Sequence, residues 1–151
     1  IRQACLALHD TVRAPIVVSG HSAGGHLAAC MLATEDYVPA AYAISGVFEL
    51  APLIPTSLNE KIGLDAAEAE ALSPMLWPAP KGKTLDAVVG EIESGEFLRQ
   101  SADMVRAWGE DGVETRYEEI ADANHFTVIA PLTDPRSPMC ERLRQLVDRA
   151  R

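Results

Sequence analysis

The sequence has few cysteines, and they do not form a recognisable pattern. The three cysteines, Cys5, Cys30 and Cys140, lie far apart along the 151 residues. An odd and scattered set is not the framework of a disulfide-stabilised domain or of a zinc knuckle. Cys5 and Cys30 lie among apolar neighbours, so we expect both to be buried thiols. This use of cysteine indicates a reducing compartment, and a cytoplasmic protein is expected.

Long apolar runs and an excess of basic residues are also missing. No apolar run approaches the roughly 20 residues of a membrane span, and no signal-peptide pattern is visible. Lys and Arg number 13 against 22 Asp and Glu, which gives a net charge of −9. Nucleic acids and anionic membranes attract basic surfaces, so neither is an expected partner. The expected partner is a small-molecule substrate, and a homodimer stays open.

Motifs for metals and nucleotide cofactors are absent as well. The sequence contains no H-E-x-x-H, no C-x-x-C and no P-loop. His21 and His26 are five residues apart, which does not place them on one face of a helix. The glycine pair at residues 24 and 25 lacks the context of a dinucleotide-binding motif. We therefore expect no metal and no cofactor.

The segments that are present alternate between strand and helix patterns. Short β-branched or apolar runs predict strands at residues 16–19, 41–45, 85–90 and 115–120. Helical spacing predicts helices from residue 1, over 23–34, over 97–109 and over the last residues, from Met139 to Ala150. The first strand is expected to be buried on both faces, and the more polar fourth strand to lie nearer an edge. This order predicts an α/β fold, with a parallel sheet covered by helices on both faces.

Residues 47–84 interrupt the alternation with a proline-rich, irregular stretch. Only residues 65–71 suggest a short helix there. A long segment without periodicity is often functional, so we expect an excursion near the active-site edge of a single domain that spans residues 1–151. Its apolar side chains either line a pocket or pack the excursion onto the sheet, and both readings stay open: they are Phe48, Leu53, Leu76 and Trp77.

The pattern G-x-S-x-G occurs at residues 20–24, between a predicted strand and a predicted helix. Alone it arises by chance in about one chain of this length in twenty, but this context is that of a nucleophile elbow. Such a sharp turn strains the serine backbone and crowds the residues two positions away, which explains Gly20 and Gly24. We expect the Ser22 hydroxyl to project beyond the sheet. The Ala23 amide, at a helix N-terminus, is the expected oxyanion donor.

A serine hydroxyl is a poor nucleophile without a base, and the chain has four histidines. We expect His9 to face solvent and His21 to point away from Ser22, in a packing or positioning role. His26 lies on the helix that follows Ser22, which holds it beside the serine. His125 lies in the loop after the fourth strand, and loops that follow parallel strands meet at one edge of the sheet. His125 is therefore the predicted base.

The imidazole needs an acidic partner to hold its tautomer and stabilise its charged form. The third strand is followed by Glu91, Glu93 and Glu96. Glu93 is preferred because it is far enough past the strand to turn back. Glu91 remains an alternative, Glu96 is placed to charge the start of the next helix, and Asp122 lies close to His125 in sequence.

The order Ser22, Glu93, His125 is that of α/β-hydrolases. The run G-H-S-A-G-G-H-L-A-A resembles the elbow of that superfamily. Three further stretches resemble its kynurenine formamidase (arylformamidase) and esterase branch: S-G-V-F-E-L-A-P-L at 45–53, G-E-I-E-S-G-E-F-L-R-Q-S at 90–101 and N-H-F-T-V-I at 124–129.

The resemblance implies a serine hydrolase that cleaves a small formamide or ester, with Ser22 as nucleophile, Glu93 as acid, His125 as base and Ala23 as oxyanion donor. The leading implied reaction converts N-formylkynurenine to kynurenine and formate, in tryptophan catabolism. A carboxylesterase acting on small acyl esters is the alternative within this class. A non-catalytic or truncated hydrolase-like binding module is the alternative outside it.

The resemblance also implies a region that this sequence does not contain. Members of the family carry an upstream H-G-G motif that supplies a second oxyanion donor, whereas this chain starts at Ile1 inside a helical pattern. We therefore expect it to be the C-terminal part of the fold, without the N-terminal strands. A missing oxyanion donor costs about 100- to 1000-fold in rate, so the isolated chain should be weakly active or inactive. Turnover of aryl esters by the pure chain at ordinary enzyme rates would contradict this.

Overall fold

The computed structural model describes all residues, 1–151, and its centre is a four-stranded sheet with strand order β1-β2-β3-β4. Every neighbouring pair of strands is parallel. The predicted parallel sheet is confirmed. The strands are β1 (Val18–His21), β2 (Ala40–Ile44), β3 (Thr84–Gly90) and β4 (Glu114–Ile120).

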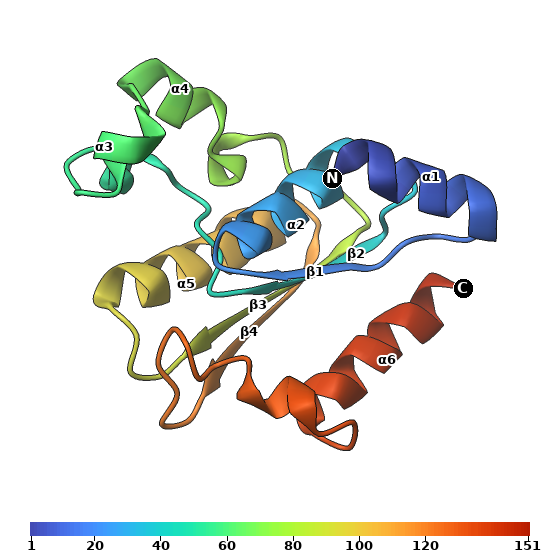
Figure 1. Ribbon diagram of the computed structural model, residues 1–151. Coiled ribbons are helices and arrows are strands. Elements are labelled where there is room, and N and C mark those ends of the chain that lie inside the picture. The colour runs from blue at the N-terminus through green and yellow to red at the C-terminus, as the bar shows by residue number, and fades with distance from the viewer.

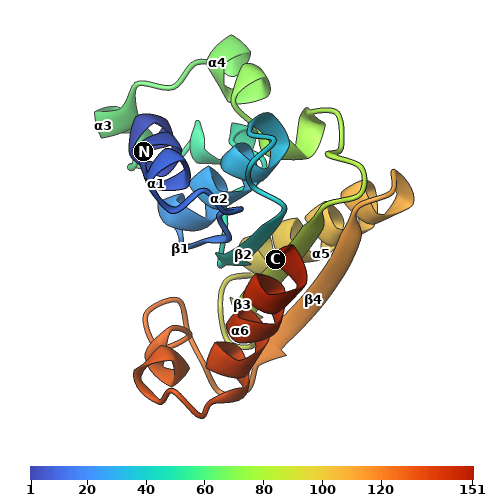
Figure 2. The ribbon, with the colours of Figure 1, turned by 90° about the vertical axis from the view of Figure 1, so that its right-hand side faces the viewer.

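Helices cover both faces of this sheet, as predicted (Figures 1 and 2). Helices α2 and α5 pack on one face, α6 packs on the opposite face, and α1 lies beside α2. None of the helices is both long and apolar enough to cross a membrane. The helices are α1 (Arg2–Val12), α2 (Ala23–Thr34), α3 (Asn59–Ile62), α4 (Ala66–Ala71), α5 (Gly95–Glu110) and α6 (Pro138–Ala150).

Two buried clusters, one on each face, hold these layers together. Strand β2 contributes residues to both clusters, because alternate residues of a strand point to opposite faces of the sheet. Ala41 and Ala43 join the cluster under α2 and α5, whereas Tyr42 and Ile44 join the cluster under α6. All five residues of β2 are buried, as expected for a central strand with helices above and below.

Strand β1 departs from the prediction that the first strand is buried on both faces. None of its four residues is fully buried, and it begins at Val18 rather than at residue 16. The reason is its position, because β1 forms one edge of the sheet and pairs only with β2. Strand β4 forms the other edge, as its polar composition predicted.

The excursion at residues 47–84 starts where β2 ends. The predicted short helix is α4, which begins with a capping box between Asp65 and Glu68. Helix α3 has only four residues, too few to produce a periodic signal in the sequence. Phe48 is buried in the cluster under α2 and α5, so its role is packing, and Leu76 is exposed. Trp77 donates its indole N–H to the Ala71 carbonyl within the excursion.

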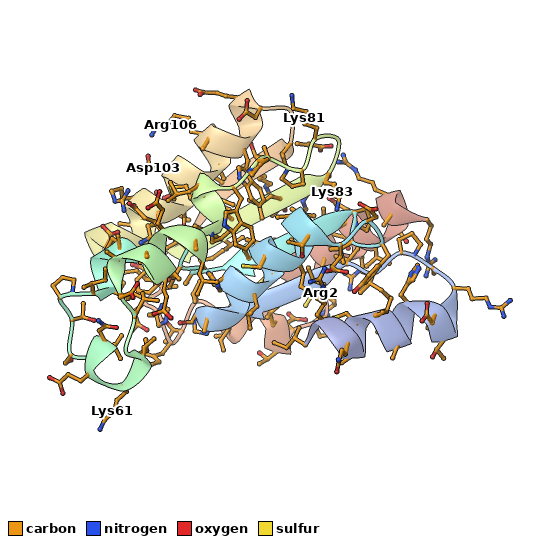
Figure 3. All side chains as sticks on the ribbon, turned by 90° about the horizontal axis from the view of Figure 1, so that it is seen from above. Arg2, Lys61, Lys81, Lys83, Asp103 and Arg106 are labelled. Carbon is orange, nitrogen blue, oxygen red and sulfur yellow. The ribbon has the colours of Figure 1, made fainter.

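The start of β3 is tied to the end of α2 through Lys83. Its Nζ donates to the carbonyl oxygens of Leu32 and Glu35, both at 2.8 Å, and Figure 3 shows Lys83 beside this end of α2. The contact places a cation where a helix leaves carbonyl groups unpaired. Partial burial lowers the pKa of Lys83.

Helix α6 is anchored to the sheet by Arg142. Its Nε donates to Oδ2 of Asp86 at 2.6 Å, and its Nη2 donates to Oδ1 at 3.0 Å. The two side chains are 11% and 1% exposed. The hydrogen bonds to Asp86 raise the pKa of Arg142. A long apolar stem lets the guanidinium reach under the helix, and a helical-wheel argument misses this.

Replacing Arg142 with alanine should lower the free energy of unfolding by about 3–5 kcal/mol, because it removes both hydrogen bonds from the buried Asp86 carboxylate and leaves only Arg116, 3.9 Å away, as a cation beside it. Urea denaturation measures the effect. The control is Arg144→Ala, since the Arg144–Glu141 pair is about half exposed on both sides and should cost less than about 1 kcal/mol. Equal losses in the two variants would contradict a structural role for the buried pair.

Candidate active site

The turn between β1 and α2 has the strained geometry expected of an elbow. Ser22 has φ 58° and ψ −118°, a region that non-glycine residues rarely adopt. The amides of Gly25 and His26 both donate to the Ser22 carbonyl, whereas the amides of Ala23 and Gly24 donate to no acceptor. The free Ala23 N–H therefore lies at the positive end of the α2 dipole, beside the serine.

The glycines of the elbow do not all serve the expected purpose. A Cβ on Gly20 would collide with the carbonyl group of Gly24, so Gly20 is required by close approach. A Cβ on Gly24 would meet nothing within 4 Å, which corrects the expectation that crowding explains this residue. The second tight contact is one residue later, where a Cβ on Gly25 would lie 2.8 Å from the Cα of Gly46. That contact sets how closely α2 approaches the end of β2.

Gly20→Ala should therefore destabilise the fold by about 1–3 kcal/mol and displace Ser22, since backbone atoms must move to admit the methyl group. Gly24→Ala should leave stability unchanged or raise it by up to about 1 kcal/mol, because alanine favours a helix over glycine. Thermal unfolding and the rate of labelling by a fluorophosphonate measure both effects. A harmless Gly20→Ala paired with a damaging Gly24→Ala would show that the elbow has another geometry.

The carboxyl ends of three strands bring together a hydroxyl, an imidazole and a carboxylate. Ser22 follows β1, Glu93 follows β3 and His125 follows β4. Ser22 Oγ lies 3.1 Å from His125 Nε2, and His125 Nδ1 lies 2.7 Å from Glu93 Oε2. An imidazole protonated on Nδ1 donates to the carboxylate and accepts from the serine hydroxyl. The three residues selected from the sequence are thus in one hydrogen-bonded line.

This line runs from a buried end to a partly open one. The Glu93 side chain is 0% exposed and that of His125 is 24% exposed. A buried carboxylate with hydrogen-bond donors around it is held in one orientation, whereas the imidazole remains within reach of a substrate.

The other acids considered for this role lie elsewhere. Glu91 is exposed, and its Oε2 accepts a hydrogen bond from the Asp122 amide at 2.9 Å. Glu96 lies in the first turn of α5, as expected, and pairs with Arg99, whose hydrogen bonds lower the pKa of Glu96. Among these acids only Glu93 contacts the His125 imidazole, so the geometry favours Glu93 over Glu91.

The sequence reasoning missed two donors to the same carboxylate. Ser45 Oγ donates to Glu93 Oε1 at 2.5 Å, and the Gly90 amide donates to the same oxygen at 2.8 Å. Ser45 directly follows β2 and is the first residue of the stretch S-G-V-F-E-L-A-P-L, in which no role was assigned to it. That resemblance and its position at the carboxyl end of a central strand were the signals available.

His21 packs against the imidazole of His125, and no hydrogen bond joins its side chain to Ser22. Its ring centroid is 4.6 Å from that of His125, and its Nε2 is buried without a hydrogen-bond partner. The sheet register explains this, because His21 pairs with Ile44 and shares its face, where the loop that carries His125 also packs. Phe97 contacts the same imidazole, with ring centroids 4.5 Å apart. The residue that His21 packs against is therefore His125.

The rings of the remaining histidines make no contact with the serine. His9 is half-buried and stacks on Tyr37 with centroids 4.8 Å apart, which corrects the expectation that it faces solvent. Its Nδ1 lies 2.8 Å from the carbonyl oxygen of Ala14, which follows α1, and this contact orients the ring. His26 Nδ1 lies 2.8 Å from the Val47 carbonyl, and its Nε2 contacts Cys30. Neither ring contacts Ser22.

All three cysteines are half-buried, so Cys5 and Cys30 are not the fully buried thiols expected. Burial raises the pKa of Cys30 to about 11, so it is a thiol at neutral pH and a weak nucleophile. No cluster of three or more His, Cys, Asp or Glu side chains is arranged to hold a metal ion.

A cavity of about 200 Å³ adjoins the imidazole through Phe97, which lines it and contacts His125. Leu53 lines the same cavity, so this residue of the excursion takes the pocket role that the sequence left open. The walls come from the excursion and the start of α5: Val47, Pro52, Leu53, Thr56, Ser94, Glu96, Phe97 and Gln100.

Comparison with known proteins relates this geometry to one fold. No family model matches the chain. It is 27% identical to kynurenine formamidase of Danio rerio over 147 residues, covering 89% of this chain and 50% of that protein. It is 29% identical to kynurenine formamidase of Salmo salar over 132 residues, covering 79% of this chain and 45% of that protein. The chain therefore spans about half the length of the curated relatives it matches.

Solved structures show the same relation. The crystal structure of a protein from Silicibacter sp. TM1040, proposed to be a thioesterase, matches 97% of this chain and 55% of that chain, with TM-score 0.75 and 35% identity. Esterase 2 of Thermogutta terrifontis matches 89% of this chain and 53% of its own chain, with a TM-score of 0.62 and 21% identity. The chain therefore has the α/β-hydrolase fold, of which it spans a part, and it is similar in sequence to kynurenine formamidases.

Proposed function

We propose that the protein containing this chain is a serine hydrolase in which Ser22, His125 and Glu93 form the catalytic triad. The observation that carries the proposal is the hydrogen-bonded line from Ser22 Oγ through the imidazole to the buried carboxylate. Its order and geometry are those by which a base activates a serine hydroxyl. The strained elbow and the free Ala23 amide support the same role.

In the first half of the reaction, His125 Nε2 takes the proton from Ser22 Oγ as this oxygen attacks the acyl carbon. Glu93 stabilises the imidazolium that forms, through its bond to Nδ1. The oxyanion of the tetrahedral intermediate then lies next to the Ala23 amide, which has no competing acceptor. When the intermediate collapses, the leaving amine or alcohol receives the proton from His125 Nε2.

In the second half, water attacks the acyl group on Ser22 and gives a proton to the same nitrogen. When the bond between the acyl group and Ser22 Oγ breaks, His125 Nε2 returns this proton to Oγ and restores the serine hydroxyl. For a formamide the products are an amine and formate, and for an ester they are an alcohol and a carboxylic acid. The residues named so far are the same in both cases.

We propose an aryl formamide, with N-formylkynurenine as the first candidate, as the preferred substrate. Similarity to kynurenine formamidases over most of the chain supports this choice. The cavity beside Phe97 supports it as well, because an aromatic wall next to the base suits an aryl group. We propose a role in tryptophan catabolism on the basis of this substrate, and the cytoplasm as its compartment on the basis of the scattered, unpaired cysteines. A small-ester carboxylesterase is the second candidate, favoured by the likeness to esterase structures.

The experiment compares N-formylkynurenine with a short aryl acetate on the full-length protein that the gene encodes. We expect the larger kcat/KM for the formamide, with loss of both activities in Ser22→Ala. A larger kcat/KM for the acetate would replace the formamidase with an esterase. A folded protein that hydrolyses neither substrate and resists a fluorophosphonate would instead be the non-catalytic, hydrolase-like binding module.

A further inference from the structure

The two oxygens of the Glu93 carboxylate have different partners. Oε2 faces His125 Nδ1, whereas Oε1 accepts from Ser45 Oγ at 2.5 Å and from the Gly90 amide at 2.8 Å. The Gly90 amide belongs to the end of the strand that carries Glu93. Ser45 lies at the end of the neighbouring strand, β2. Of the two donors, it is the one that donates from a side chain. The Ser45 hydroxyl links the carboxylate to a second strand.

The backbone of Ser45 is held in a conformation that does not suit serine. Its φ is +47°, in the left-handed region, and the residue is 0% exposed. Its amide donates to the Val88 carbonyl at 2.6 Å, which fastens this turn to β3. Glycine adopts such a backbone without steric cost, so the backbone alone favours glycine at this position. What serine adds is a hydroxyl that points at Glu93 from a rigid, buried support.

A carboxylate on a flexible side chain can rotate and swing, and either motion would break its bond to the imidazole. Two donors on Oε1 remove that freedom and leave Oε2 aimed at Nδ1. A short O–H···O⁻ bond is among the stronger hydrogen bonds in proteins, and its burial here increases its effect. Partners of this kind, one shell beyond the reacting groups, commonly set the precision of a site.

We infer that Ser45 is a positioning residue, which holds the Glu93 carboxylate and through it the His125 imidazole in line with Ser22. The inference rests on the proposed function, because it assigns Ser45 a part in that same site. Ser45 contacts neither the Ser22 hydroxyl nor the imidazole, so it acts only through Glu93.

The first test measures kcat and KM, with the rate of fluorophosphonate labelling, in full-length Ser45→Ala and Ser45→Gly. We expect kcat and the labelling rate to fall about 10- to 100-fold, as for other outer-shell partners, with KM changed less than about threefold. Ser45→Gly removes the backbone strain along with the hydroxyl. It should therefore lose less thermal stability than Ser45→Ala while losing as much activity, which separates positioning from folding.

The matched control is Ser101→Ala. Ser101 is also a fully buried serine, on α5, but its hydroxyl has no hydrogen-bond partner. Removing this hydroxyl should leave kcat and KM at wild-type values. An equal loss of activity in Ser101→Ala and in both Ser45 variants would show a general packing effect and would overturn the inference.

The second test is a double-mutant cycle with Glu93→Ala. If Ser45 acts through Glu93, adding Ser45→Ala to Glu93→Ala should lower kcat less than about threefold further. The same large loss in both backgrounds would overturn the inference, since Ser45 would then act independently of the carboxylate. Wild-type activity in both Ser45 variants would overturn it too, while labelling of Ser22 would leave the proposed function intact. Absence of labelling in the folded wild-type protein would overturn both.

Discussion

Ser22→Ala should abolish covalent labelling by a fluorophosphonate and lower kcat by on the order of 10⁶-fold in the full-length protein. The Ser22 hydroxyl is the one nucleophile that the structure places against an imidazole and next to a free helix N-terminal amide. Without it no acyl-enzyme can form, and only binding and the oxyanion donors can assist water. Mass spectrometry of the labelled protein and steady-state kinetics on the preferred substrate measure the two effects.

Ser22→Ala should remove the hydroxyl without disturbing the backbone of the elbow. Alanine and serine carry the same backbone cost at φ 58°, so the strained elbow is preserved when only the oxygen is removed. Ser19→Ala is the matched control, because this serine lies three residues earlier on β1, is exposed and should retain full labelling. Labelling that persists in Ser22→Ala on another residue would reject Ser22 as the nucleophile.

Glu93→Gln should lower kcat by about 10⁴-fold with little change in KM. The side chain keeps its shape, but its amide nitrogen cannot accept the proton on His125 Nδ1. If the amide nitrogen turns toward His125, the imidazole must carry its proton on Nε2 instead, where it can no longer accept from Ser22. If the amide oxygen faces His125, the nitrogen instead opposes the Ser45 hydroxyl and the Gly90 amide, which are both donors.

Glu91→Gln separates this effect from a general loss of acidic charge in the loop. Glu91 accepts from the Asp122 amide, and the amide oxygen of glutamine can accept the same bond. Its kcat should therefore stay within about twofold of wild type. A loss in Glu91→Gln as large as in Glu93→Gln would show that the loop adopts another arrangement during turnover and that Glu91 is the acid.

The elements that carry the site were largely predictable because their signals are local. A β-branched run followed by G-x-S-x-G and a helical stretch specifies a strand, a tight turn and a helix within about 20 residues. The steric demand that places Gly20 in that turn acts between residues four apart, so it is visible in one dimension. Parallel topology then implies that residues after the strands meet at one edge, which led to residues 93 and 125 as candidates.

Short-range sequence patterns did not predict the burial of β1 or the contact of Arg142. Residues 16–19 predict a buried strand, but β1 lies at one edge of the sheet and is half-exposed. The burial of a strand depends on which segments lie beside it, and its own residues do not show this. Arg142 belongs to the polar face of its helix by periodicity, yet it reaches under that helix to Asp86. Such outcomes depend on the path of distant segments.

The sequence by itself determined the elbow, the parallel order of strands and the edge of the sheet where polar side chains collect, because bond geometry and hydrophobic periodicity act over a few residues. Only the tertiary structure decided which carboxylate faces His125, that Ser45 supports it, and that His21 and Phe97 contact the imidazole. Those contacts depend on strand register and on loop paths, where a shift of one residue moves a side chain beyond hydrogen-bonding distance.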